Sequence, residues 1–92
     1  MIRSFADKET EKVFQRLPTK FGKRLQSAAH EKLLLLHSAK SLDDLRSPPG
    51  NLLGKLAGDR KGQYSIRINK QFRPCFIWNA GIADAVEVVD YH

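Results

Sequence analysis

Two kinds of hydrophobic spacing divide the chain. Across residues 6–37, apolar side chains recur every three or four positions, which is typical of amphipathic helices. After the stretch RSPPGN the spacing falls to two, which indicates strands with one buried face. The stretch itself favours a break, because proline fixes its own φ and disfavours helix in the residue before it. The pattern therefore predicts helices first and a sheet afterwards.

Capping and turn residues set the expected boundaries. Asp7 is expected to cap a first helix that Pro18 ends, a second helix is expected over about 23–37, and SLDDL offers a serine cap and one further helical turn. GDRKG and Asn79–Gly81 are turn sequences, and Pro74 indicates an interrupted or edge position in its strand. The expected strands are a short first one at Ile2–Phe5, then 51–57, 63–69, 72–78 and about 82–91.

These elements predict an α+β fold in which two N-terminal helices pack on one face of a mostly antiparallel, four- to five-stranded sheet. Residues 1–92 are expected to form one domain. Alternation assigns one set of side chains to the helices: Tyr64, Ile66, Ile68, Phe72, Phe76 and Trp78. The opposite set would face away from them: Ser65, Arg67, Asn69, Arg73, Cys75 and Ile77. The second face is therefore expected to be open and rich in arginine and polar groups.

The charge is concentrated in one part of the chain. The formal net charge is +6, and residues 46–73 hold seven cations against the single acid Asp59, whereas residues 74–92 hold three acids and neither lysine nor arginine. Such a distribution favours a polyanionic partner, nucleic acid first, over a surface that is merely solubilising. The longest apolar run is four leucines, and Arg3 is followed by no apolar leader, so neither a membrane span nor a signal peptide is expected. The single Cys75 cannot form an internal disulfide, which fits a cytoplasmic location.

The final residues VVDYH place a carboxylate, a phenol and an imidazole together. The run GDR-x-G-x-x-S-I-R-x-N, in the stretch RSPPGNLLGKLAGDRKGQYSIRINKQFRPCFIW, combines with this ending. Together the two motifs resemble the HigB toxins of the RelE/ParE superfamily, over nearly the whole chain. The resemblance implies a RelE-like fold and a ribosome-dependent mRNA endoribonuclease that acts in the ribosomal A site. It also implies a helix-turn-helix antitoxin of the HigA type, through which operator DNA would be bound indirectly.

Under this resemblance the chemistry is 2′-OH attack on the scissile phosphate, which needs a base, an acid and cations for the developing charge. On a regular strand Asp90 and His92 project to the same side and Tyr91 to the other, unless the strand bends. Guanidinium groups bind phosphate bidentately and are always charged. The candidate catalytic residues are Arg73, Asp90, Tyr91 and His92, and the candidate RNA- and phosphate-binding residues are Arg46, Lys55, Arg60, Lys61 and Arg67.

Structural roles compete with these assignments. Arg60 could equally pair with Asp59 or with carbonyls of its turn, and Asp90 could only fix the last strand. His30 and His37 are expected at the surface or the end of the second helix, and no cofactor or metal is predicted, because ligand spacing is missing around them.

One departure from the family pattern bears on the function. Relatives can carry a histidine and a lysine in the turn before GDR, where this chain has Gly54 and Ala57, with Lys55 nearby. This departure keeps two other readings open: a ParE-like inhibitor that binds a protein such as gyrase without cleaving RNA, and a plain RNA-binding module.

Overall fold

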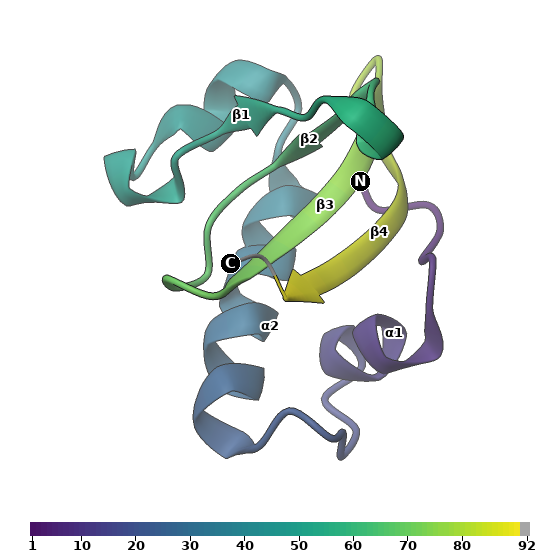
Figure 1. Cartoon of the computed structure of the whole chain (residues 1–92), viewed down its shortest axis with the longest axis vertical. Coiled ribbons are helices and arrows are strands. Elements are labelled where there is room, and N and C mark those ends of the chain that lie inside the picture. The colour runs from purple at the N-terminus through teal and green to yellow at the C-terminus, as the bar shows by residue number, and fades with distance from the viewer. Residues whose placement is uncertain (91–92) are drawn as a thin grey trace.

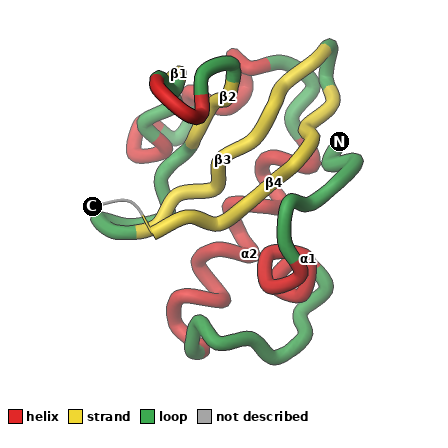
Figure 2. Tube along the Cα trace, turned by 45° about the vertical axis from the view of Figure 1, so that its right-hand side comes forward, coloured by secondary structure: helices red, strands yellow, loops and turns green. Residues whose placement is uncertain are grey.

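Two helices lie on one face of a four-stranded antiparallel sheet in the computed structural model, which describes residues 1–90 (Figure 1). Figures 1 and 2 show α2 behind the sheet and α1 beside the β4 edge. The predicted fold class is therefore confirmed. The helices are α1 (Lys8–Phe14) and α2 (Lys23–Ser38), and the strands, in their order across the sheet, are β1 (Gly54–Lys55), β2 (Gln63–Ser65), β3 (Phe72–Asn79) and β4 (Ile82–Asp90).

Helix α1 begins where the sequence predicts but ends early. The Asp7 side chain accepts from the backbone N–H of Thr10, as expected of an N-cap. The helix ends at Phe14, before Pro18 is reached, because Arg16 takes a positive φ of 62°. The N–H groups of Arg16 and Leu17 then donate to carbonyls of the last turn, which is the hydrogen-bond pattern of a Schellman motif.

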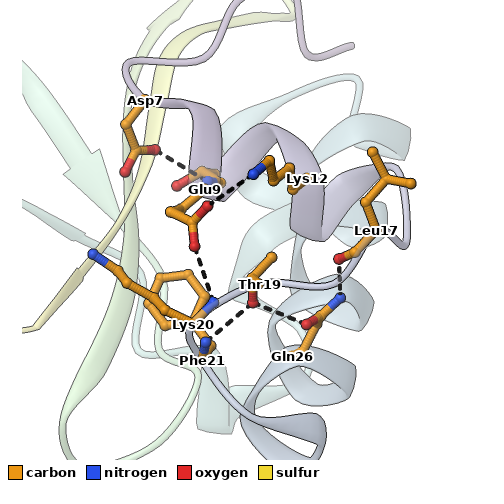
Figure 3. Close-up of polar contacts among 9 residues, drawn as sticks. Asp7, Glu9, Lys12, Leu17, Thr19, Lys20, Phe21 and Gln26 are labelled. Carbon is orange, nitrogen blue, oxygen red and sulfur yellow. Dashed lines mark hydrogen bonds and ion pairs between the residues drawn. The ribbon is translucent and has the colours of Figure 1, made fainter.

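The connection between α1 and α2 is tied down by side chains of both helices (Figure 3). Glu9 of α1 accepts from the backbone N–H of Lys20 at 3.0 Å. Gln26 of α2 donates to the carbonyl of Leu17 at 2.6 Å and accepts from the Thr19 hydroxyl at 2.9 Å. These bonds hold the connecting loop against both helices.

The core lies between the helices and the side chains that β3 and β4 direct toward them. Phe76 is its largest fully buried side chain; Val13, Leu33, Leu36, Leu45, Ile66, Ala83, Val86 and Val88 are also buried there. His30, expected at the surface, is only 8% exposed and lies with its Nδ1 3.0 Å from the carbonyl oxygen of Val13, so that expectation was wrong. The hydroxyl of Thr10 accepts from the N–H of Val88 at 2.8 Å and fastens α1 to the outer edge of β4.

The predicted first strand at Ile2–Phe5 is not a regular strand. Only two residues bridge to β4, in parallel orientation: Ile2 opposite Ala83 and Phe5 opposite Val86. The segment nevertheless covers the free edge of β4, as the path of the chain in Figure 2 shows. An edge covered in this way offers fewer unpaired backbone groups to other chains.

Strands β1 and β2 are shorter than the alternation predicts. Of the expected strand 51–57 only Gly54–Lys55 pairs, because Asn51 ends a 3₁₀ turn and Leu52 has a positive φ of 46°. Of the expected strand 63–69 only Gln63–Ser65 pairs. The ladder to β3 stops at Ser65, one position before the residue opposite Pro74, which has no N–H to donate. Strand β3 itself runs through Pro74 without a break and pairs there with Val88 of β4, so the predicted interruption affects only the pairing with β2.

The segment between α2 and β1 is held by Asn51. Its side chain donates to the carbonyls of Leu45 and Ser47, both at 3.2 Å, and accepts from the ammonium group of Lys32 on α2. Its own carbonyl accepts from the N–H of Arg67 at 2.6 Å. SLDDL forms the predicted helical turn as a 3₁₀ helix over Leu42–Arg46.

Candidate active site on the uncovered sheet face

The register of β3 and β4 sorts side chains between the two faces of the sheet. Phe72, Pro74, Phe76 and Trp78 face the helices with the core residues of β4. Residues that pair across neighbouring strands share a face, so Arg73 lies beside Val89, and Cys75 lies beside Glu87 on the opposite, uncovered face. The predicted arginine-bearing open face is therefore present, and it carries a carboxylate as well.

Arg60 reaches across this face. It ends η3 (Gly58–Arg60), the 3₁₀ turn that connects β1 with β2. Its Nη1 donates to Gln63 Oε1 on β2 at 3.2 Å, and its Nη2 donates to Glu87 Oε1 on β4 at 3.1 Å. Because β3 lies between β2 and β4, the guanidinium spans the central strand. The competing pairing with Asp59 is not seen among the ion pairs of the described residues, so Arg60 belongs to the sheet face and not only to its turn.

Arg73 stands on the same face of the central strand. Its Nη1 lies 3.4 Å from the hydroxyl of Ser65, which pairs with Cys75 across β2 and β3. Ser65 and Cys75 are fully buried although they face away from the helices. Burial raises the pKa of the Cys75 thiol, the charge of Glu87 also raises it, and the charges of Arg60 and Arg73 lower it. The thiol is therefore neutral at pH 7 and lies within the electrostatic reach of all three groups.

A bulge in β4 adds a second carboxylate to this face. Cys75 pairs with Glu87 and Ile77 pairs with Asp84. Two steps along β3 therefore match three steps along β4, so β4 contains one extra residue in this interval. Ala85 absorbs it with a positive φ of 52°, and its N–H donates to the hydroxyl of Ser4 at 2.9 Å. Asp84 is bound by the guanidinium of Arg3 through two nitrogens, and this contact lowers the pKa of the Asp84 carboxyl.

Two of the predicted RNA-binding lysines line a hollow beside η3. Lys55 and Lys61 border an open cavity of about 440 Å³, together with Gly58, Gly62 and Tyr64. Ala57, one of the two positions that depart from the family pattern, lines the same hollow. Gly54, the other, lies in β1, and a Cβ there would meet nothing closer than the carbonyl oxygen of Leu52 at 3.9 Å. Ala57 therefore lies beside the two lysines of this hollow, and Lys55 pairs with Tyr64, which belongs to the alternation that faces the helices.

The remaining candidate residues are placed less centrally. Arg46 is exposed and pairs with Asp43 in its own turn at 3.1 Å. Arg67 is half-buried after the end of β2. Asp90 pairs with Phe72 across β3 and β4, which assigns it to the strand alternation opposite that of Arg73, and it accepts from Gln71 at 3.0 Å. Tyr91 and His92 lie outside the described residues.

Sequence reasoning missed Glu87 as a member of the site. Its position in the alternation was readable from its neighbours Val86 and Val88, which are core residues. Its pairing with Arg60 was not, because the two are 27 positions apart and meet only through the sheet order. Within residues 1–90, no three histidine, cysteine, aspartate or glutamate side chains are grouped to hold a metal ion. In the same part of the chain, no helix has the length and apolar character to cross a membrane.

Comparison with known families gives one match over nearly the full length. Residues 3–92 match the family model described as RelE-like toxin of type II toxin–antitoxin system HigB. Among curated proteins, toxin HigB-1 of Vibrio cholerae is 46% identical over 59 residues, which are 64% of this chain and 62% of that protein. An uncharacterised protein of Haemophilus influenzae is 37% identical over 60 residues, which are 65% of this chain and 57% of that protein. The matched segments thus span about three fifths of these relatives.

Solved structures agree on the fold. A histidine-to-glutamine mutant of YafQ from E. coli superposes with a TM-score of 0.66 at 12% identity, covering 98% of this chain and 91% of YafQ. YoeB in the YoeB–YefM complex from Staphylococcus aureus superposes with a TM-score of 0.63 at 20% identity, covering 100% of this chain and 95% of that one. At these identities the likeness concerns the fold.

Proposed function

Because the chain belongs to the HigB family of RelE-like toxins of type II toxin–antitoxin systems, we propose that it is an endoribonuclease that cleaves mRNA on the ribosome and so inhibits translation. The observation that carries this proposal is the pair of arginines on the uncovered sheet face. Arg60, from the turn η3, and Arg73, from β3 itself, both act electrostatically on the buried Cys75 thiol of β3, and Lys55 and Lys61 line a hollow beside η3. Such a surface suits a phosphodiester backbone.

The chemistry assigns a step to each group. A base removes the proton from the 2′-OH, the oxygen attacks the adjacent phosphorus, and an acid protonates the departing 5′-oxygen. His92 is proposed for proton transfer because its imidazole titrates near neutral pH, with Asp90 and Tyr91 as its partners. Arg73 and Arg60 would stabilise the charge that grows on the phosphate oxygens. The products are a 2′,3′-cyclic phosphate and a 5′-hydroxyl end.

The proposed partner is a helix-turn-helix antitoxin. The net charge of +6 would favour a less basic protein, and operator DNA would be bound by the pair through that partner. The similar fold of YoeB, solved as the YoeB–YefM complex, supports a protein partner for this fold. A cytoplasmic location follows from the proposed ribosomal substrate.

A non-nucleolytic toxin is the second candidate. It is favoured by one observation: Gly54 and Ala57 stand where relatives can carry a histidine and a lysine, beside the hollow lined by Lys55 and Lys61. A toxin of this kind would bind a protein target such as gyrase, as ParE-like relatives do, and leave mRNA intact. A module that only binds RNA would neither cleave nor inhibit growth.

The decisive experiment is cleavage of a defined mRNA by the purified chain, with and without programmed ribosomes, followed by mapping of the 5′ ends. We expect cuts at A-site codons that appear only with ribosomes and carry 5′-hydroxyl groups. The matched control is the variant lacking His92. Growth inhibition with intact mRNA and inhibited gyrase would reject the nuclease and support the second candidate.

A further inference from the structure

A glutamate stands among the phosphate-binding arginines, where a carboxylate would repel the substrate. Glu87 holds the Nη2 of Arg60 at 3.1 Å, and the side chains of both residues are 32% exposed. Gln63 holds Nη1 at 3.2 Å from the opposite side. The two contacts suspend the guanidinium between β2 and β4, above the buried thiol of Cys75 on β3.

The backbone position of Arg60 explains why its side chain must be held by Glu87 and Gln63, two contacts called here the clamp. The residue ends a three-residue 3₁₀ turn that begins at Gly58 and is followed by Gly62, both glycines having positive φ, and the turn has no buried residue. A long side chain on such a turn samples many rotamers unless it is bound at its tip. Arg73, in contrast, lies within the eight-residue strand β3, where pairing with Val89 of β4 fixes its backbone.

The clamp leaves the guanidinium able to bind an anion. A guanidinium has five N–H donors, and the described residues engage one on each terminal nitrogen. Glu87 binds through one oxygen in a single contact, and therefore does not occupy the fork that a phosphate uses. Arg60, Arg73 and Glu87 together keep a net positive charge.

We propose that Glu87 is a positioning residue, which fixes the guanidinium of Arg60 over the sheet face so that it meets the RNA phosphate without prior reordering. The inference rests on the proposed ribonuclease function. Glu87 neither transfers a proton nor contacts the RNA in this scheme, and its effect on cleavage passes through Arg60. Pre-ordering of a binding group reduces the entropy lost when the substrate arrives.

Three substitutions of Glu87 separate the effect of its side-chain length from the effect of its negative charge. Glu87→Gln keeps the length and an oxygen acceptor, Glu87→Asp keeps the charge but withdraws it by one methylene, and Glu87→Ala removes both. We expect single-turnover cleavage on programmed ribosomes to fall about 10-fold in the Ala and Asp variants and to stay within about 3-fold of wild type in the Gln variant. The matched control is Asp84→Asn, which removes the negative charge from the other carboxylate–arginine pair on the same face of β4 and should leave the rate unchanged.

A double-mutant cycle tests whether Glu87 acts through Arg60. If it does, Arg60→Ala combined with Glu87→Ala cleaves no more slowly than Arg60→Ala alone. If the rate of the double variant instead fell by the product of the two single-variant losses, the proposal would be overturned. So would a Gln variant that falls by 10² or more, since that loss is typical of a proton-transfer group. Faster cleavage by Glu87→Ala would also overturn it, because Glu87 would then compete with the phosphate.

A second readout does not depend on catalysis. The Nε–Hε signal of Arg60 in ¹⁵N NMR relaxation should report an ordered side chain in wild type and Glu87→Gln, and an averaged one in the Asp and Ala variants. If the wild-type chain cleaves no RNA, the proposed function fails, and this readout still decides whether Glu87 orders Arg60. An averaged Arg60 in the wild type would refute the positioning role by itself.

Discussion

Arg73→Ala separates the contribution of this arginine to catalysis from its contribution to stability. The Nη1 of Arg73 lies 3.4 Å from the Ser65 hydroxyl, at the outer limit of a hydrogen bond, so this bond adds little to folding. Its aliphatic stem lies near Ser65 and Cys75, which are buried on the open face, and losing this cover should cost about 1 kcal/mol. In a domain of this size that lowers Tm by about 4–8 °C.

The rate should fall much further than the stability. Loss of one donor to the developing negative charge costs about 10²-fold or more, which corresponds to roughly 2.7 kcal/mol. A stability loss of about 1 kcal/mol leaves a protein of ordinary stability almost fully folded at 25 °C, so unfolding cannot imitate a hundredfold loss. Cleavage of ribosome-bound mRNA and a thermal melt on the same preparation measure the two effects.

Two matched variants complete this test. Arg73→Lys should restore only part of the rate, because an ammonium group cannot reproduce the fork of the guanidinium. Lys70→Ala removes the same charge from an exposed residue before β3 and should change neither quantity much. Wild-type cleavage by a folded Arg73→Ala protein would remove Arg73 from the site.

Three further predictions concern the frame of the site and its chemistry. Thr10→Val leaves the N–H of Val88 without its acceptor and should cost about 1–3 kcal/mol in urea unfolding, while Thr10→Ser should cost less; equal stability of the valine variant and wild type would exclude a role for the bond. The pKa of Asp84 is lowered by Arg3, so its contribution to stability is present at neutral pH and is lost as the pH falls below about 4, through the depressed pKa of the folded state. Asp84→Asn should therefore flatten the acid side of the stability profile, and an unchanged profile would contradict this linkage. Deleting His92 should leave the melting temperature and antitoxin binding unchanged and slow cleavage by about 10²–10⁴-fold, and full toxicity of that variant would end the catalytic assignment.

Local sequence signals predicted the helices and the layers of the fold well. The N-cap at Asp7, the span of α2 and the turn at Asn79–Gly81 all depend on contacts within a few residues, which sequence patterns report directly. The early end of α1 was missed because it depends on Arg16 in a left-handed conformation, which arginine rarely adopts. Pro18 was the stronger signal but came too late in the chain.

Strand lengths and pairings could not be predicted, because they depend on residues that are adjacent across the sheet but distant in the sequence. Strand β2 ends at Ser65 because the residue opposite its next position is Pro74, and that opposition is known only once the register is known. In the same way Arg60 was predicted to bind phosphate, but its two partners belong to β2 and β4. The types of residue in the site could be predicted from the sequence. Their contacts with one another could not, because these depend on the order and register of the strands.

The bulge in β4 decides which carboxylate meets which arginine. Its core positions are Ala83, Val86 and Val88, a spacing of three followed by two, and strict alternation cannot bury all of them. Without the extra residue either Asp84 would face the helices or Glu87 would, and a carboxylate buried against Phe76 would have no partner. With it, Asp84 lies beside Arg3 at one end of the open face and Glu87 beside Arg60 at its centre. The backbone irregularity that keeps the core apolar thus also delivers Glu87 to the place from which it can hold Arg60.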